Sequence, residues 1–173
     1  MDIKLSNILS VPAKVYESEI PLDYKFMTFK GMDYQVAYMT PVHMKLTNMG
    51  NQKLHIEADF SIHLNIPCDR CLDDVLHEYE IQVDRKIDVS ERADNQDLDD
   101  VSFISEYNLD VDMLVYEEVF VRLPMKNLCS EDCKGICSVC GANLNRGECG
   151  CDRRVPDPRM SDILDIFNSF KEV

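Results

Sequence analysis

Six of the chain's eight cysteines fall within residues 129–151, which read CSEDCKGICSVCGANLNRGECGC. Thiols this close together are typical of a metal site in a reducing compartment or of disulfides in an oxidising one. The N-terminal stretch MDIKLSNILSVPAKVYESEI lacks the basic start and apolar block of a secretory signal. No apolar run is long enough to span a membrane. We therefore expect a cytoplasmic protein without a membrane segment, whose cysteines bind metal, with disulfides as the main alternative.

The tail contains one complete set of four candidate metal ligands. CSVCG at 137–141 has the spacing of a zinc knuckle, in which two sulfurs face one ion. The glycine after the second cysteine permits the tight turn that points backbone N–H groups at the sulfurs. ECGC at 148–151 supplies a second pair, joined to the first by the polar, turn-rich GANLNRGE. Four thiolates make a closed, structural site for Zn²⁺, and the predicted ligands are Cys137, Cys140, Cys149 and Cys151.

The other four cysteines leave the number of zinc ions, one or two, open. Cys129 and Cys133 form a CxxxC pair, and Cys68 and Cys71 form a CxxC pair in the stretch IPCDRCLDD. These two pairs together would make a second four-sulfur site. The competing arrangement is a single site with the ligands Cys129, Cys133, Cys137 and Cys140. The tail is too short for a core of its own, so bound metal would supply much of its folding free energy.

Two alternating runs before the tail predict a long β-hairpin. In residues 54–64, LHIEADFSIHL, apolar side chains occupy every second position, and residues 77–87 alternate in a similar way. Such alternation is typical of half-buried antiparallel strands. IPCDRCLDD falls between the runs, at the predicted hairpin tip. Residues 34–50, YQVAYMTPVHMKLTNMG, add one or two strands, interrupted at Pro41.

A helix is expected at 110–124, DVDMLVYEEVFVRLP, which Asp110 can cap and Pro124 ends. Its predicted core-facing stripe comprises Met113, Tyr116, Phe120 and Leu123, with Leu114 and Val121 beside it. The acidic stretch 91–109 has little periodicity and predicts a mobile loop or linker. Asp157 and Pro158 favour the start of a second helix, whose apolar stripe comprises Met160, Ile163, Leu164 and Phe167.

Together these elements predict an α+β fold, mainly an antiparallel sheet that could curl toward a barrel and that carries a packed helix. The predicted divisions are an acidic α+β domain at 1–124, a Cys-rich zinc-binding tail at 125–156 and a C-terminal helix at 157–173. Residues 1–124 hold 11 basic and 24 acidic residues, within a net charge of −14 for the chain. A domain of this charge repels phosphates and attracts basic partners.

The motifs CDRCL, LCSEDCKGICSVCGANLNRGECGC and DPRM resemble the YceD family, and the similarity runs from about residue 30 to residue 168. The family is described as large ribosomal RNA subunit accumulation proteins of bacteria and plastids, linked to accumulation of 23S ribosomal RNA. The resemblance implies a role in biogenesis of the large ribosomal subunit, and no enzymatic activity is established for the family.

The charge pattern favours one way of performing such a role. We expect the acidic domain to bind a basic ribosomal protein or assembly factor, and the tail to add a contact to ribosomal RNA. A zinc-thiolate redox switch, which would release its ion on oxidation, is one alternative. An enzyme with a site on the sheet, using His55 and His63, is another. The chain contains no Gly-rich phosphate loop, nucleophile elbow or HExxH motif, so we expect no enzymatic activity.

Overall fold

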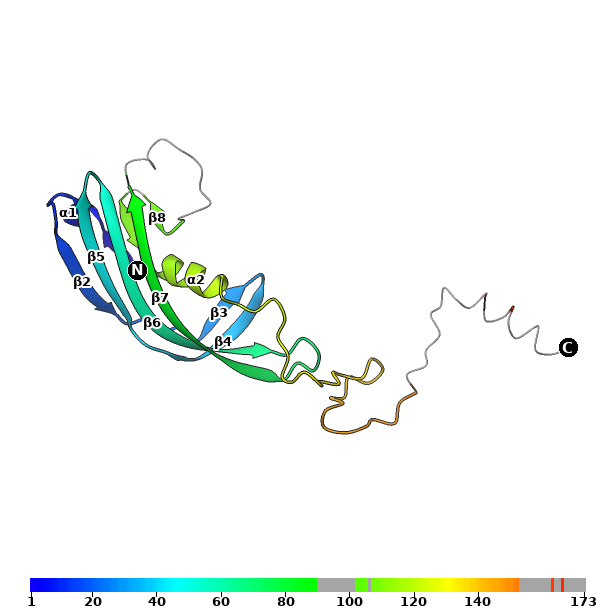
Figure 1. Ribbon diagram of the computed structural model, residues 1–173. Helices are drawn as coiled ribbons and strands as arrows, with labels where there is room; N and C mark the ends of the chain where they lie inside the picture. The colour runs from blue at the N-terminus through cyan, green and yellow to red at the C-terminus, as the bar shows by residue number, and fades with distance from the viewer. Residues whose placement is uncertain (90–101, 106, 153–162, 164–165, 167–173) are drawn as a thin grey trace. The chain divides into compact units, whose positions relative to one another are not determined.

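The computed structural model describes residues 1–89, 102–105, 107–152, 163 and 166 (Figure 1). The chain forms two compact units. The first contains Met1–Pro67 and Asp74–Asn127, and the second contains Cys68–Asp73 and Leu128–Val173. The tip of the predicted hairpin therefore belongs to the second unit, together with the cysteine-rich tail. Among the described residues, no helix is both long and apolar enough to cross a lipid bilayer.

The first unit is built on two 15-residue strands, β6 (Lys53–Pro67) and β7 (Asp74–Asp88). They pair antiparallel along their whole length (Figure 1), so the predicted hairpin is confirmed. The other edge of β6 is shared by two strands. β5 (Val42–Gly50) pairs with its first half, and β4 (Met32–Met39) pairs with its second half.

The division between β4 and β5 lies at Thr40, next to the predicted interruption at Pro41. The Thr40 N–H donates to the Ser61 carbonyl at 3.0 Å, and the Ser61 N–H donates to the Thr40 hydroxyl at 2.9 Å. β2 (Val15–Ile20) extends the sheet beyond β5, and β3 (Phe26–Phe29) extends it beyond β4. Within the described residues this sheet stays open, so the barrel that the alternation allowed does not form.

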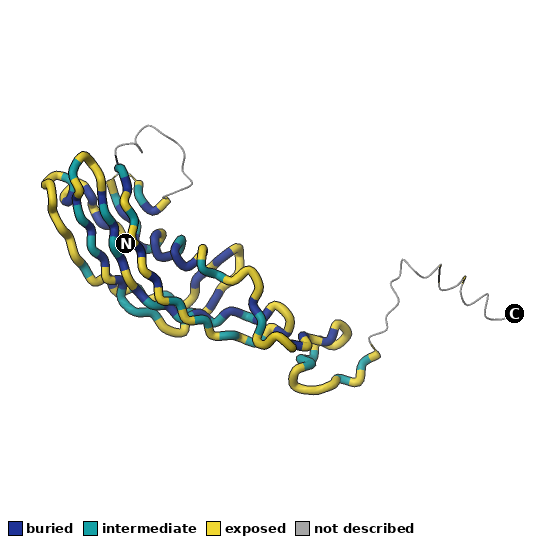
Figure 2. The backbone as a smooth tube through the Cα atoms, viewed as in Figure 1, coloured by how far each residue is buried: buried dark blue, intermediate teal, exposed yellow. Residues whose placement is uncertain are grey.

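The two faces of the six-stranded sheet differ, as the alternation predicts (Figure 2). One face is buried under helix α2 (Val111–Phe120). From β6 this face contributes Leu54, Ile56, Ala58, Phe60, Ile62 and Leu64. Burying a large aliphatic or aromatic side chain contributes roughly 1.5–3 kcal/mol, so this face carries most of the unit's hydrophobic stabilisation. The opposite face, which we call the outer face, is polar.

Helix α2 begins as predicted, but its inward face differs from the prediction. The Asp110 carboxylate accepts hydrogen bonds from the N–H groups of Asp112 at 3.0 Å and Met113 at 3.3 Å. Leu114 is buried, and Tyr116 and Leu123 pack against the core. Met113, Phe120 and Val121 are 37%, 38% and 69% exposed, so the predicted stripe is confirmed only in part. The apolar side chains cover much of the helix circumference, and spacing alone could not select the side that meets the sheet. The buried residues are Val111, Leu114, Val115, Glu118 and Val119.

A smaller sheet replaces part of the predicted linker. β9 (Asn108–Asp110) pairs with β8 (Ile104–Ser105) and with β1 (Asp2–Lys4), which is followed by helix α1 (Ser6–Leu9). Phe103 and Leu109 are completely buried. The linker prediction is therefore wrong for residues 102–105 and 107–109, because two apolar side chains anchor this acidic stretch. The rest of the stretch lies outside the described residues, as does the predicted helix at 157–173, apart from Ile163 and Ile166.

Candidate metal centres

The eight cysteines lie in two groups of four within the second unit. The tip cluster consists of Cys68, Cys71, Cys129 and Cys133, and the tail cluster consists of Cys137, Cys140, Cys149 and Cys151. Within each group, all sulfur atoms lie within 4.8 Å of one another. The structure thus brings together the four tail sulfurs that the sequence spacing predicted as one site. It also brings the Cys68/Cys71 pair and the Cys129/Cys133 pair together as a second site. It does not gather the competing set of Cys129, Cys133, Cys137 and Cys140.

The geometry of the tip cluster fits a zinc ion. Tetrahedral coordination with Zn–S bonds of about 2.3 Å places the sulfurs about 3.8 Å apart. The Sγ atoms of Cys68 and Cys133 are 3.8 Å apart, and those of Cys71 and Cys129 are 3.5 Å apart. A site closed by four thiolates has no open position for a reacting water, so it is structural rather than catalytic. Each cluster could hold one metal ion.

The same turn presents the first pair of sulfurs in each cluster. The Leu72 N–H donates to the Cys68 carbonyl, and the Gly141 N–H donates to the Cys137 carbonyl, both at 2.9 Å. Leu72 and Gly141 have φ angles of 62° and 72°, in the left-handed region. CDRCL and CSVCG are therefore two copies of one knuckle turn, and only the second has the glycine that this backbone favours.

Replacing Leu72 by glycine is expected to stabilise the second unit by about 0.5–1 kcal/mol, because glycine relieves the left-handed strain. The leucine is 64% exposed, so its loss removes little packing. The reverse change, Gly141→Ala, should destabilise by a similar amount, since the added Cβ would meet no atom within 4 Å. Chelator competition for zinc measures both effects. Unchanged affinity in both variants would contradict the assignment of a shared turn.

A polar network connects the hairpin tip to the loop between the tail pairs. The Asp73 carboxylate accepts hydrogen bonds from Asn143 Nδ2 at 2.7 Å and from the Arg146 guanidinium at 2.8 Å. Asn145 donates through Nδ2 to the Cys133 Sγ at 3.3 Å, and its Oδ1 accepts from the Lys134 N–H at 2.8 Å. The loop therefore orients both a ligand and the tip. The sequence interpretation missed these residues, although the alternating asparagines of GANLNRGE were a signal.

Gly135 allows the tail to approach the tip backbone closely. The N–H of the next residue, Ile136, donates to the Arg70 carbonyl at 3.0 Å. A Cβ placed on Gly135 would lie 3.0 Å from that same carbonyl oxygen, and its φ of +75° already favours glycine. Any side chain at this position must push the two segments apart.

Gly135→Ala is therefore expected to weaken metal binding at the tip cluster by at least about tenfold, since left-handed strain of about 0.5–1 kcal/mol adds to the clash with the Arg70 carbonyl. A Co²⁺ titration, followed by the thiolate-to-metal absorption band, measures this loss. Gly141→Ala is the matched control, because it has the same backbone strain without a neighbouring atom. A loss no larger than that of the control would exclude close approach as the reason for this glycine.

Backbone N–H groups prepare one thiol in each cluster for metal binding. Burial alone would raise the pKa of Cys68, but the N–H groups of Arg70 and Cys71 outweigh it and lower this pKa to about 6. The N–H groups that follow Cys137 likewise lower its pKa to about 6. Two neighbouring sulfurs act in the opposite direction on Cys151 and raise its pKa to about 12. A bound cation would favour the ionised form of all four thiols in a cluster.

Residues 56–167, a range that includes all eight cysteines, match the family model described as large ribosomal RNA subunit accumulation protein YceD. The chain belongs to the YceD family. The resemblance seen in the CDRCL and tail motifs is thereby confirmed. The YceD match begins within β6 and contains both knuckle turns.

Two curated proteins share parts of this YceD sequence. The chain is 24% identical over 127 residues to "Uncharacterized protein YlbN" of Bacillus subtilis (strain 168), covering 72% of each chain. It is 35% identical over 49 residues to "Large ribosomal RNA subunit accumulation protein YCED homolog 1, chloroplastic" of Arabidopsis thaliana. That match covers 28% of this chain and 15% of the plant protein. No solved structure matched the chain.

Proposed function

We propose that this chain is a non-enzymatic factor in biogenesis of the large ribosomal subunit, which acts by binding a basic ribosomal protein or assembly factor. The description of the YceD family supports the cellular role. The charge of the outer face supports the kind of partner. The tail adds a contact to ribosomal RNA in this proposal, through exposed cationic residues such as Lys134 and Arg146.

The outer face of the six-stranded sheet is the observation that carries the proposed partner. The pairing register places nine carboxylates and three lysines on this face of β2, β5, β6 and β7. The lysines are Lys45, Lys53 and Lys86. The carboxylates are Glu17, Glu19, Glu57, Asp59, Asp74, Glu78, Glu80, Asp84 and Asp88. Such a surface attracts cationic side chains over several ångströms and repels nucleic acid phosphates.

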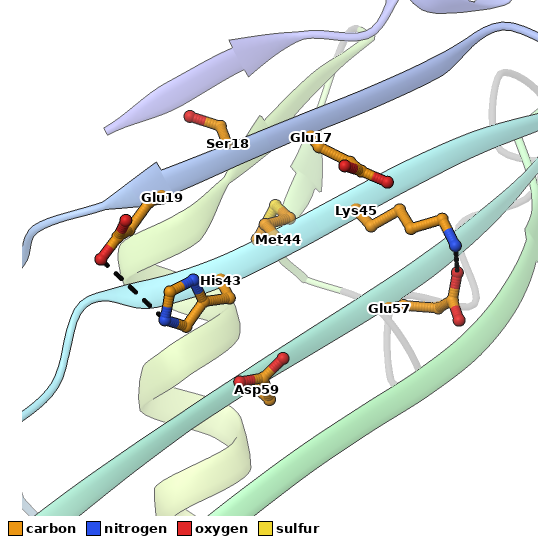
Figure 3. A pocket seen from close by; sticks show the side chains of 8 residues that line it. All are labelled: Glu17, Ser18, Glu19, His43, Met44, Lys45, Glu57 and Asp59. Carbon is orange, nitrogen blue, oxygen red and sulfur yellow. Dashed lines mark ion pairs between the residues drawn. The ribbon is translucent and has the colours of Figure 1, made fainter.

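A hollow of about 460 Å³ on the outer face gathers four of these carboxylates (Figure 3). Lys45 lies 3.2 Å from Glu57, and His43 lies 3.9 Å from Glu19. Glu17 and Asp59 form no ion pair with the residues that the structure describes, so their charge is available to a partner. An arginine or lysine of a bound protein would find acceptors here without displacing an existing pair.

Each cluster binds one Zn²⁺ in this proposal. Four thiolates at tetrahedral spacing select a soft ion, and zinc is the usual occupant of such sites. The metal's contribution is structural, because it holds the hairpin tip and the tail in one fold. The cations of the tail then have fixed positions from which to meet a phosphate backbone.

The histidines have contacts that suit structural roles better than catalysis. His55 Nε2 lies 2.8 Å from the Asp84 carboxylate, and the His63 ring lies 5.2 Å from the Tyr38 ring. His77, in β7, contacts Asn127 at 2.8 Å. These contacts favour the binding protein over the enzyme.

The test measures binding of the zinc-loaded chain to purified basic proteins of the large subunit, at low and at physiological salt. The triple variant Glu17→Gln, Glu19→Gln, Asp59→Asn is expected to lose at least about tenfold in affinity for the partner, with a weaker salt dependence. The matched control, Asp23→Asn, Glu131→Gln, Asp132→Asn, removes three exposed carboxylates outside the outer face. Its affinity should stay within about twofold of wild type.

Two outcomes would contradict the proposal. One is tight binding to large-subunit ribosomal RNA at physiological salt together with no binding to any basic protein. The other is equal loss in the outer-face variant and the control, which would mean that net charge alone drives association. In cells, the outer-face variant should lower the ratio of large-subunit to small-subunit ribosomal RNA, and the control should not.

A further inference from the structure

The two clusters differ in how the protein holds their ligands, and this difference has a functional consequence. We propose that the tail cluster is an exchangeable zinc site, which gives its ion to a competing ligand and takes it back, while the tip cluster keeps its ion. This inference rests on the two-zinc loading in the proposed function. It adds a second role to a metal centre that would otherwise be structural throughout.

Access to the sulfur atoms is the first difference. In the tip cluster, Cys68, Cys71 and Cys133 are 0%, 4% and 4% exposed, and Cys129 alone is exposed. In the tail cluster Cys137 alone is buried, Cys140 is exposed, and Cys149 and Cys151 are half-buried. Transfer of zinc between ligands proceeds through attack by the incoming ligand on the bound ion. The tail cluster admits such a ligand, and the tip cluster shields its ion on most sides.

Support for the ligands by other side chains is the second difference. At the tip cluster, the Asn145 side chain donates to the Cys133 Sγ, and the Arg70 guanidinium donates to the Cys133 carbonyl at 3.0 Å. The Cys129 N–H donates to the Cys68 Sγ at 3.3 Å. At the tail cluster, the donors to the Cys137 Sγ are backbone N–H groups of the same turn, those of Val139 at 3.4 Å and of Cys140. Hydrogen bonds from residues outside the turn, such as those at the tip cluster, fix a ligand and slow its departure from the metal.

The backbone that carries the ligands is the third difference. Cys137 is held in place, since its N–H donates to the Ala142 carbonyl at 2.8 Å and Ile136 bridges to Asn143. Within the described residues, the second pair of tail ligands lacks such support, because 147–151 make no backbone-to-backbone hydrogen bond there. Cys149 and Cys151 are therefore held chiefly by the ion itself, and they can leave it together when the ion is taken.

The exchange step involves no redox change. Zn²⁺ passes from the tail thiolates to the incoming ligand, and the released thiolates take up protons from water. The tip cluster and the Asp73 network remain in place throughout, so the knuckle at Cys137 stays ordered and the site can reload. A chain with these properties responds to the free zinc of its surroundings without unfolding its second unit.

The test starts from full-length protein shown by elemental analysis to hold two zinc ions. It is mixed with excess 4-(2-pyridylazo)resorcinol, and zinc transfer is followed by the absorbance of the dye. We expect two phases of one equivalent each, with rates that differ by at least about tenfold, as outer-sphere support alone changes metal binding by about 10–100-fold. The double variant Cys149→Ser, Cys151→Ser should lose the fast phase and keep the slow one.

Asn145→Ala is the matched variant for the tip cluster. It should accelerate the slow phase by at least about tenfold and leave the fast phase unchanged. Release of both ions at one rate, or a fast phase that survives loss of Cys149 and Cys151, overturns the inference and leaves the two-zinc proposal standing. A preparation that binds one zinc, through the tip cysteines alone, overturns both. The number of zinc ions bound per chain tests the two-zinc proposal, and the release rates test exchange at the tail cluster.

Discussion

Removal of both metal ions is expected to unfold the second unit and to leave the first unit folded. The buried hydrophobic cluster of the chain, among the described residues, is made of side chains of the first unit. The second unit has eight cysteines and a polar network in place of such a core. Structural zinc contributes about 10–16 kcal/mol in small zinc-dependent folds, which exceeds what these few hydrogen bonds can supply.

A two-dimensional amide NMR spectrum measured before and after addition of a strong chelator tests this expectation. Signals from residues 128–152 should collapse to the shifts of unfolded chain, while dispersed strand signals remain. Trypsin should then cleave at Lys134 and Arg146. Cys129→Ser should reproduce much of the effect without a chelator, and Ser130→Ala is the neighbouring control. Dispersed tail signals in metal-free protein, or simultaneous loss of both sets, would contradict the expectation.

Arg85→Ala is expected to lower the free energy of unfolding of the first unit by about 1.5–3 kcal/mol, the typical cost of losing a hydrogen bond to a charged group. Glu118, on the buried side of α2, is 4% exposed. Its carboxylate pairs with Arg85 of β7 and with Arg122, the latter at 2.6 Å. Without Arg85, the buried Glu118 carboxylate keeps Arg122 as its ion-pair partner. The change also removes the guanidinium that lies 5.5 Å from the Phe103 ring centroid.

Urea denaturation, monitored by far-ultraviolet circular dichroism, measures this change. The double variant Arg85→Met, Glu118→Leu is the informative comparison, because removing both charges leaves no buried carboxylate. It should recover most of the lost stability. Arg122 is 33% exposed and can turn to water in that variant. A cost below about 1 kcal/mol for Arg85→Ala would mean that Glu118 does not depend on this ion pair.

The extent to which sequence predicted the fold depended on how local each signal was. The β6–β7 hairpin was predictable, because period-two alternation persists over both strands and needs no knowledge of distant residues. The inward face of α2 was not, because that choice depends on which side chains meet β7. Phe103 and Leu109 also escaped notice, since two apolar residues in an acidic stretch show no periodicity until β1 pairs with β9.

How well each candidate metal centre could be predicted also depended on how far apart its ligands lie in the sequence. The four tail cysteines lie within 15 residues of sequence, so a single spacing argument could group them. The tip cluster combines pairs separated by more than fifty residues, and spacing left it open against a competing set. The partners of Asp73 and Cys133 were missed, because the asparagines of GANLNRGE indicate a polar role without indicating which residues they contact. Metal binding itself stays a prediction in both clusters.

The position of the tip cluster along the chain has one more consequence. A metal ion that joins Cys71 to Cys129 ties the intervening segment, with β7, β8, β9 and α2, into a closed ring. A closed ring has fewer unfolded conformations than an open chain. The lost conformational entropy of the unfolded state stabilises the folded state by about 4 kcal/mol for a loop of this length. The ion would thus stabilise strands and a helix that supply none of its ligands, by restricting the disordered state rather than by adding contacts to the folded one.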